Sequence, residues 1–214
     1  MRTIMVLNSK GGCGKSTIAT NLASYYAWEE ERTVALVDFD PQASSLEWLA
    51  VRGEEWPPIV GIEGGPGRLP VPRSTEVVVM DAPARVSGAE LTALVRRAQT
   101  LVIPVLPSPL DMRAAAHFIR DLLTVGRVSR RQTRIAVVAN RVRENTRSFH
   151  NLEMFLEGLS IPFLTHLRDT QNYIRAAERG IGIFEMAPSQ VWQDVEQWQP
   201  LVRWLRSKRS LPAA

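Results

Sequence analysis

Two lysines, three glycines and a serine near the start of the chain have a spacing suited to binding phosphate. They occupy the stretch Lys10-Gly11-Gly12-Cys13-Gly14-Lys15-Ser16-Thr17. Glycine has no side chain, so backbone N–H groups can curve around phosphate oxygens. Lys15 supplies a positive charge for the outer phosphates, and the Ser16 hydroxyl can ligate Mg²⁺. These residue types predict a phosphate-binding loop for a nucleotide.

The flanking segments are those that such a loop requires. The apolar run 4–7 predicts a buried strand before the loop, and residues 18–27 predict a helix after it. The first turn of that helix directs its free N–H groups and positive dipole end toward the bound phosphate. A glycine-rich turn arising by chance is the alternative, and the strand, the helix and both lysines argue against it.

Carboxylates follow two further apolar runs. Asp38 ends the run 33–38 and is followed by Asp40, and Asp81 ends the run 77–81. The carboxyl ends of parallel strands lie beside the phosphate loop of an open α/β sheet. We therefore expect Asp38 and Asp81 to support Mg²⁺, and Asp40 to face the terminal phosphate and orient a water molecule. The alternative for each is an aspartate that only caps a strand.

The loop departs from the common pattern G-x-x-x-x-G-K-[ST] in two ways: Ser9 replaces the first glycine, and a second lysine, Lys10, precedes the glycines. This string resembles the deviant Walker A box of the ParA/MinD family of ATPases. The resemblance implies ATP and Mg²⁺ as cofactors, with Lys10, Lys15 and Asp40 in catalysis. It also implies a homodimer that sandwiches ATP, in which Lys10 reaches the phosphates bound by the other subunit.

The resemblance extends along nearly the whole chain. The D-x-D-P string at 38–41 is similar to the family's first switch, in which Asp40 positions the attacking water, and the run ending at Asp81 is similar to a Walker B strand. Asn140 ends the apolar run 134–140, and the resemblance assigns it to adenine, for which an amide offers both donor and acceptor. A turn asparagine is the alternative. The expected nucleotide-binding residues are Gly11, Gly12, Cys13, Gly14, Lys15, Ser16, Thr17 and Asn140.

Six apolar strands alternating with helices predict a doubly wound α/β fold, a mostly parallel sheet with helices on both faces, formed by one domain over residues 1–214. Helices are expected over 44–51, 90–98, 112–125 and 145–158, and a short strand over 161–165. The glycine- and proline-rich segment 61–73 predicts a surface connection. Pro200 predicts a break in the tail 189–210, where a second short helix would begin.

The composition of the chain excludes several kinds of site and several classes of protein. The 214 residues are 45% hydrophobic and include one cysteine, Cys13, so disulfides and cysteine-built iron–sulfur or zinc sites within one chain are excluded. Cys13 is interpreted as a small filler whose backbone matters; a reactive thiol beside phosphate is the alternative. No apolar run approaches the roughly 20 residues of a membrane span, and no signal sequence is recognisable, so a cytoplasmic protein is expected.

The net charge is +4, and the arginines concentrate in the second half of the chain. They cluster at 127, 130, 131 and 134, at 141, 143 and 147, at 168, 175 and 179, and, with Lys208, at 203, 206 and 209. Such clusters suit nonspecific binding to a phosphate backbone, although a solvated surface explains any one of them equally well. Because ParA-type proteins bind DNA as ATP-bound dimers, the resemblance favours DNA, and Arg175, Arg179, Arg203 and Arg206 are the first candidates.

The leading hypothesis is a ParA-type ATPase without an amino-terminal DNA-reading domain. It would dimerise on ATP, associate with the nucleoid, and use hydrolysis stimulated by a ParB-like or other adaptor to segregate or position a plasmid, chromosome or protein assembly. A MinD-like membrane-associated ATPase is the alternative, suggested by the basic, aromatic segment 201–209. A metabolic or electron-transfer enzyme with the same loop is the third class, and it lacks the required cysteines or a marked second substrate.

Overall fold

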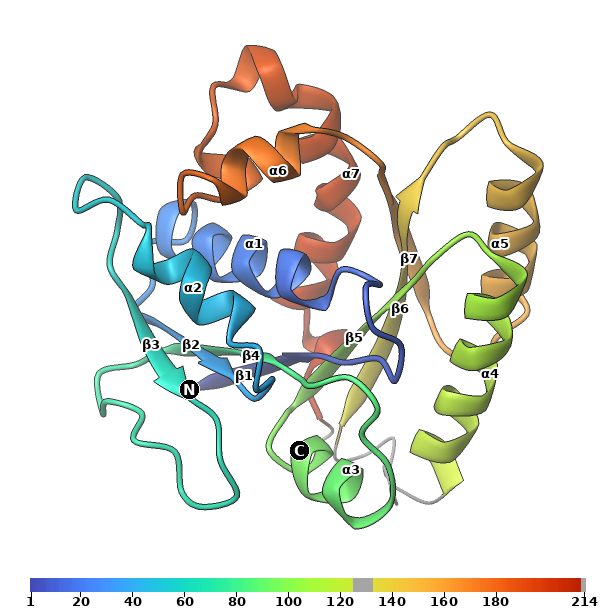
Figure 1. Ribbon diagram of the computed structural model, residues 1–214, viewed down its shortest axis with the longest axis horizontal. Helices are drawn as coiled ribbons and strands as arrows, with labels where there is room; N and C mark the ends of the chain where they lie inside the picture. The colour runs from blue at the N-terminus through green and yellow to red at the C-terminus, as the bar shows by residue number, and fades with distance from the viewer. Residues whose placement is uncertain (125–132, 213–214) are drawn as a thin grey trace.

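A computed structural model of the chain describes residues 1–124 and 133–212. In these residues seven strands form one sheet in the order β3-β2-β4-β1-β5-β6-β7 (Figure 1), and every neighbouring pair is parallel. The strands are β1 (Arg2–Val6), β2 (Val34–Asp38), β3 (Ile59–Glu63), β4 (Val77–Asp81), β5 (Thr100–Val105), β6 (Arg134–Val142) and β7 (Phe163–Arg168). The doubly wound α/β fold expected from the sequence is confirmed.

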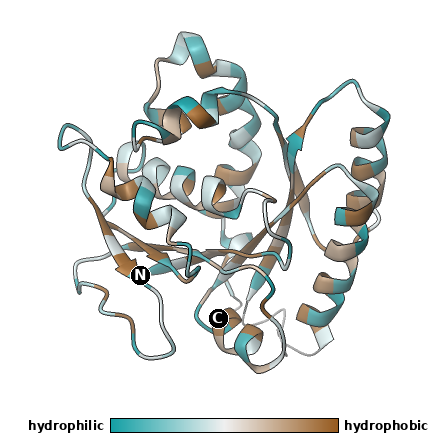
Figure 2. Cartoon of the chain, in the orientation of Figure 1, coloured by the Kyte–Doolittle hydropathy of each residue, from teal (hydrophilic) through white to brown (hydrophobic). Residues whose placement is uncertain are grey.

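Helices cover both faces of the sheet. They are α1 (Lys15–Trp28), α2 (Ser44–Ala50), α3 (Gly88–Val95), α4 (Pro109–Thr124), α5 (Arg147–Glu157), α6 (Asn172–Ala177) and α7 (Pro188–Arg206), with 3₁₀ turns at Ile183–Glu185 and Lys208–Ser210. One core lies under α3, α4 and α5, and the other under α1, α2, α6 and α7. Successive strand side chains point to opposite faces, so each buried strand supplies both cores and must be apolar throughout. Figure 2 shows the brown strands between helices whose outer faces are teal.

The segment expected to be a surface connection from residue 61 onward begins as a strand. Ile59–Glu63 is β3, the edge strand beside β2, with Ile59 and Ile62 buried. At Gly61 an added Cβ would lie 2.8 Å from the Leu49 side chain of α2. Glycine here therefore permits the close approach of a helix and does not mark a turn. The prediction was wrong for residues 61–63, because only two buried apolar residues identify this strand, whereas residues 64–73 form no helix or strand, as expected.

The predicted break at Pro200 is also wrong. Helix α7 continues through Pro200 to Arg206. Proline costs about 3 kcal/mol in a helix interior, partly because the carbonyl four residues earlier loses its partner. Here that carbonyl belongs to Glu196, an exposed residue. The fully buried Trp198 and Leu201 pack on either side of the proline, and this burial offsets the cost.

Other boundaries differ by a few residues. Strand β7 begins at Phe163 and ends at Arg168, three residues beyond the end expected from the sequence. Helix α3 begins two residues earlier and ends three residues earlier than expected. Residue 125, the expected end of α4, lies outside the described residues. In the part of the chain that is described, no helix is both long and apolar enough to cross a membrane.

A buried ion pair joins the segment just after α2 to the 3₁₀ turn Ile183–Glu185. The Arg52 and Glu185 side chains are 4% and 0% exposed, and Arg52 Nη1 donates to Glu185 Oε2 at 3.0 Å. Arg52 also donates to the carbonyl of Gly180, and Glu185 accepts the N–H of Gly182. Gly180 has φ +63°, and a Cβ there would lie 2.4 Å from the Arg52 backbone nitrogen. The loop can therefore follow this path only with glycine at position 180.

The last described residues of the chain lie beside the amino-terminal ends of the strands. The Arg2 guanidinium at the start of β1 donates to the Ser210 hydroxyl at 2.8 Å and to Thr100 Oγ1 at 2.7 Å. Ser210 is fully buried. These hydrogen bonds fix the 3₁₀ turn after α7 beside the first residues of β1 and β5. The phosphate loop lies at the other ends of the strands.

Candidate nucleotide-binding site

The phosphate loop connects the carboxyl end of β1 to the first turn of α1. Gly14 precedes α1 with φ +90°, and Gly12 has φ +74°, both in the left-handed region that glycine adopts without strain. A Cβ at Gly14 would lie 2.1 Å from Asn140 Nδ2. The loop therefore requires glycine at position 14 for both conformation and space. Asn8 fixes the start of the loop, because its Nδ2 donates to the Pro104 carbonyl at 2.6 Å.

The Lys15 ammonium lies inside this loop. Its Nζ donates to the Lys10 carbonyl at 3.2 Å, and the residue is 7% exposed. The Lys10 side chain is only half-buried, and its ammonium makes no ion pair with any residue that the structure describes. The two lysines of the motif thus have different environments: Lys15 is committed to the loop, and Lys10 is available to a group outside it.

Cys13 is 1% exposed, and its Sγ donates to the Lys10 carbonyl at 3.3 Å. Burial raises the pKa of the Cys13 thiol, although Lys15 offsets part of that shift. A buried thiol with a raised pKa carries little of the reactive thiolate. This environment favours the interpretation of Cys13 as a filler over a redox role.

The two carboxylates expected at the strand ends differ in what they contact. Both oxygens of Asp38 are used: Oδ1 accepts the Asp40 N–H at 2.9 Å, and Oδ2 accepts the Ser45 N–H at 2.8 Å. Asp81 is fully buried, and its Oδ2 accepts the Ser45 hydroxyl at 2.6 Å. Its Oδ1 has no hydrogen-bond partner among the described residues. Asp38 thus holds the start of α2, whereas Asp81 keeps one oxygen free.

This free oxygen fits the predicted Mg²⁺. Mg²⁺ is usually held by one or two carboxylates, several waters and the substrate phosphates. In the described residues no group of three or more His, Cys, Asp or Glu side chains could bind a metal alone. Ser16 at the start of α1 and Asp81 would provide the protein's share, and Asp38 would support them through α2.

Burial raises the pKa of Asp81 to about 6, and the nearby Ser16 and Ser45 hydroxyls offset part of that shift. The folded pKa lies above the value of about 3.9 for an unfolded aspartate, so ionisation of this group opposes folding. We expect its contribution to the free energy of unfolding to rise as the pH falls from about 6 to about 4. Mg²⁺-dependent ATP binding should weaken over the same range, because the metal requires the carboxylate.

Urea unfolding and ATP titrations with Mg²⁺ or EDTA, at pH values from about 4 to 8, test both trends. Asp81→Asn should remove this part of each pH dependence. If the variant and the unmodified protein respond to pH identically, Asp81 does not have the raised pKa.

Asp40 lies at the cavity wall. It is half-buried, and its Oδ1 accepts the N–H of Gln42 at 3.0 Å. Its backbone N–H is bound to Asp38, so the turn carrying Asp40 is fixed from both sides. A carboxylate held in this way can accept a proton or a hydrogen bond from water in the cavity.

A cavity of about 940 Å³ contains most of the predicted residues. Its lining residues are Gly11, Gly12, Gly14, Lys15, Ser16, Thr17, Asp40, Gln42, Ser44, Ala84, Arg85, Asn140, Arg141, Arg168, Asp169, Thr170, Tyr173 and Ile174. The phosphate loop lines one part of it, and the segment 168–174, from the last residue of β7 into α6, forms a second wall. Lys10 is not part of the lining, and Asp38 and Asp81 lie buried behind it.

Asn140 is 4% exposed and lines the cavity at the end of the apolar part of β6. Its Nδ2 donates to the Cys13 carbonyl at 2.8 Å. One half of the amide thus fixes the phosphate loop to β6. Contact between Asn140 and the base stays a prediction. The hydrogen bond from Asn140 to the phosphate loop was not predicted, because its position at a strand end did not indicate it.

Sequence reasoning missed the wall at 168–174. The expected strand ended at Thr165, so Thr170 and Tyr173 received no role, and Arg168 was counted only among the basic clusters. An arginine three residues after the expected end of a strand gives no spacing signal of its own. Their contribution becomes visible only when β7 ends beside β6 at the carboxyl edge of the sheet.

The four arginines proposed for DNA do not form one patch. Arg175 and Arg179 are exposed at and just after the end of α6, next to the cavity. Arg203 and Arg206 are exposed in the last turn of α7, toward the opposite edge of the sheet (Figure 1). Arg206 also forms an ion pair with Glu30 at 3.3 Å. Arginines 127, 130 and 131 lie outside the described residues.

The chain matches the model of the family described as "CobQ/CobB/MinD/ParA nucleotide binding domain" over residues 4–183. It is 33% identical over 192 residues to the maintenance of carboxysome distribution protein A of Gloeobacter kilaueensis, covering 86% of this chain and 84% of that protein. The protein of the same name from Halothiobacillus neapolitanus is 29% identical over 191 residues, covering 86% and 87%.

A solved structure of apo McdA from Cyanothece superposes with a TM-score of 0.73 at 14% identity, covering 94% of this chain and 99% of that one. That likeness supports the fold. The family match covers most of the chain and includes the phosphate loop, Asp40, Asp81 and Asn140. The chain therefore belongs to the CobQ/CobB/MinD/ParA family of nucleotide-binding domains and is an ATPase of the ParA/MinD type.

Proposed function

We propose that residues 1–214 form one ATPase domain that dimerises on ATP and positions a cargo while bound nonspecifically to DNA. The observation that carries this proposal is the contrast between the two lysines. The Lys15 ammonium lies within its own loop, whereas Lys10 adjoins the phosphate site, lies outside the cavity lining and has no ionic partner among the described residues. A cation in that position can meet phosphates held by a second copy of the chain.

Within one subunit the residues divide the work between binding and hydrolysis. The loop N–H groups and Lys15 bind the phosphates, and the first turn of α1 adds its dipole. Bound Mg²⁺ would neutralise phosphate charge, with Ser16 and Asp81 as its protein contacts. Asp40 would hold the attacking water in line with the terminal phosphate. Lys10 of the other subunit would add a charge in a site that closure shields from solvent, where it acts strongly.

The basic surfaces support DNA as the partner. Exposed arginines occur near the cavity on α6 and at the end of α7, so a dimer would carry at least two separate basic regions per subunit. Joining two copies would double the phosphate contacts, and affinity for DNA would rise on ATP binding. A ParB-like or other adaptor that stimulates hydrolysis would reverse the cycle.

The carboxyl-terminal segment gives little support to the membrane alternative. Leu201, Val202 and Leu205 are each at most 3% exposed and belong to the core under α1 and α7. An interfacial membrane helix needs its apolar face free. As to cargo, the two relatives named for maintenance of carboxysome distribution favour a protein assembly over a plasmid or chromosome.

The experiment compares the unmodified protein with Lys10→Ala, with and without Mg²⁺ and ATP. The unmodified protein should elute as a dimer with ATP and co-sediment with DNA, with affinity falling steeply as salt rises. Lys10→Ala should bind ATP but stay monomeric and lose ATP-dependent DNA retention. Arg113→Ala, an exposed change on α4, is the control. Unchanged ATP-dependent dimers in Lys10→Ala would refute the role of Lys10, and retention on liposomes in place of DNA would favour the membrane function.

A further inference from the structure

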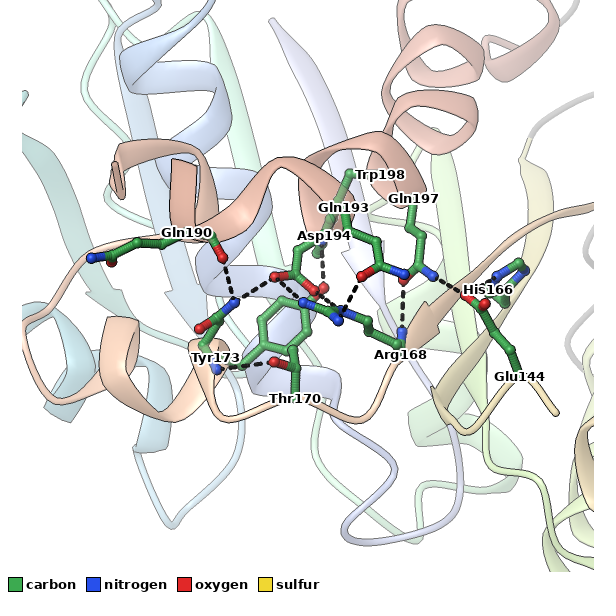
Figure 3. A network of polar contacts seen from close by, with 11 residues as sticks. Glu144, His166, Arg168, Thr170, Tyr173, Gln190, Gln193, Asp194, Gln197 and Trp198 are labelled. Carbon is green, nitrogen blue, oxygen red and sulfur yellow. Dashed lines mark hydrogen bonds and ion pairs between the residues drawn. The ribbon is translucent and has the colours of Figure 1, made fainter. Parts of the chain in front are cut away.

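One face of α7 holds the cavity wall that lies away from the phosphate loop. We call this the α7 polar face and define it as Gln193, Asp194, Gln197 and Trp198. Figure 3 shows these side chains directed from α7 toward the segment between β7 and α6. They contact Arg168, Asn172 and Tyr173, of which Arg168 and Tyr173 line the cavity.

Asp194 is the centre of these contacts. It is fully buried, and its carboxylate accepts hydrogen bonds from Arg168 Nε, from Arg168 Nη2 at 3.1 Å and from Asn172 Nδ2 at 2.7 Å. A buried carboxylate is tolerated only when its oxygens are paired in this way. The bidentate contact fixes the plane of the guanidinium as well as its position. Asp194 thereby orients Arg168, which lines the cavity, and fixes Asn172, the first residue of α6.

The other members of the α7 polar face hold the same wall. Gln193 Oε1 accepts from Arg168 Nη1 at 2.7 Å, and Gln197 Oε1 accepts the Arg168 backbone N–H at 2.9 Å. Trp198 Nε1 donates to the Tyr173 hydroxyl at 2.9 Å. The hydrogen bonds that the structure shows for the backbone N–H and the guanidinium of Arg168 therefore all have their acceptors on α7.

The shape of the cavity determines what this wall meets. The phosphate loop and the first turn of α1 occupy one end and bind phosphate. The rest of the lining includes Asn140, Arg168, Thr170 and Tyr173, which provide polar groups and an aromatic ring for the nucleoside of a bound ATP. Aromatic and guanidinium faces are the surfaces on which bases stack.

We propose that Asp194 is a positioning residue for the nucleoside of ATP, acting through Arg168. It contributes to the affinity for the base and ribose and leaves the affinity for the phosphates unchanged. This inference rests on ATP as the ligand of the proposed function. It assigns α7, none of whose residues line the cavity, to the nucleotide site.

The test measures binding of Mg²⁺-ATP and of Mg²⁺-tripolyphosphate by calorimetry. Asp194→Asn keeps the shape but removes the charge that pairs with Arg168, and it should raise the Kd for ATP about tenfold, as expected for one lost hydrogen bond to a charged group. The Kd for tripolyphosphate should change by less than about twofold. The matched control is Glu196→Gln, an exposed acid on the same helix, which should bind both ligands normally.

A milder variant covers the case in which Asp194→Asn does not fold. Gln193→Ala removes one acceptor of Arg168 from a half-buried position and should weaken ATP binding about threefold, again without affecting tripolyphosphate. Equal weakening of the two ligands would show a general structural role and overturn the proposal, as would normal ATP binding in both variants. If the unmodified protein binds tripolyphosphate but not ATP, the proposed function itself fails.

Discussion

Replacing Asp40 with alanine is expected to lower the rate of ATP hydrolysis about 10²- to 10⁴-fold, the usual contribution of a positioned acid or base. The physical reason is the fixed turn at the cavity wall. The Asp40 N–H is held by Asp38, and its Oδ1 accepts the Gln42 N–H, so its carboxylate has a defined position facing the cavity. Alanine removes the group that would orient the water but none of the groups that bind phosphate.

Affinity for Mg²⁺-ATP should therefore stay within a few-fold of the unmodified protein, since the phosphate contacts are intact. Because the ATP state persists, the variant should also remain a dimer on DNA. Single-turnover hydrolysis and nucleotide titration measure the two effects separately. Glu47→Gln, an exposed acid on α2, is the control and should hydrolyse ATP normally. Normal turnover in Asp40→Ala would remove Asp40 from the mechanism.

Arg52→Ala is expected to lower the free energy of unfolding by about 3–5 kcal/mol, because it leaves the Glu185 carboxylate buried without its cation. The two side chains are 4% and 0% exposed, so water cannot replace the lost partner. The change also removes the donor to the Gly180 carbonyl. Urea denaturation followed by circular dichroism measures the difference.

Arg32→Ala provides the comparison. Arg32 pairs with Glu76 at 2.8 Å, but these side chains are 51% and 44% exposed. Solvent and salt screen such a pair, so its loss should lower the free energy of unfolding far less than the loss of Arg52. A cost for Arg52→Ala as small as that for Arg32→Ala would contradict the buried ion pair.

The features that the sequence predicted are those that local chemistry determines. Strands β1, β2 and β4 are buried on both faces, so they are continuous apolar runs, and a carboxylate or a glycine loop marks the end of each. The φ of +90° at position 14 is a local requirement for glycine in the phosphate loop. The parallel direction of the strands followed from their alternation with helices, whereas their order in the sheet was not predicted.

The features that the sequence did not predict depend on contacts between separate segments of the chain. Strand β3 has two buried side chains and a glycine that admits α2, and this pattern is indistinguishable from a loop. The wall at Arg168 depends on Asp194, 26 residues later on another helix. Likewise, Arg175 and Arg206 both belong to the arginine-rich half of the chain. Arg175 lies near the carboxyl-terminal ends of the strands and Arg206 near their amino-terminal ends, because α7 runs from one to the other.

The contact of Arg2 with Ser210 has a practical consequence for imaging. The two residues meet at the amino edge of the sheet, while the phosphate loop lies at the carboxyl edge. A fluorescent protein fused to either end would emerge on the side of the subunit remote from the nucleotide. In a dimer closed over its two nucleotides, such fusions would point outward from both subunits. Tagged molecules could then be studied without the tag obstructing the surface through which the subunits of the proposed dimer would join.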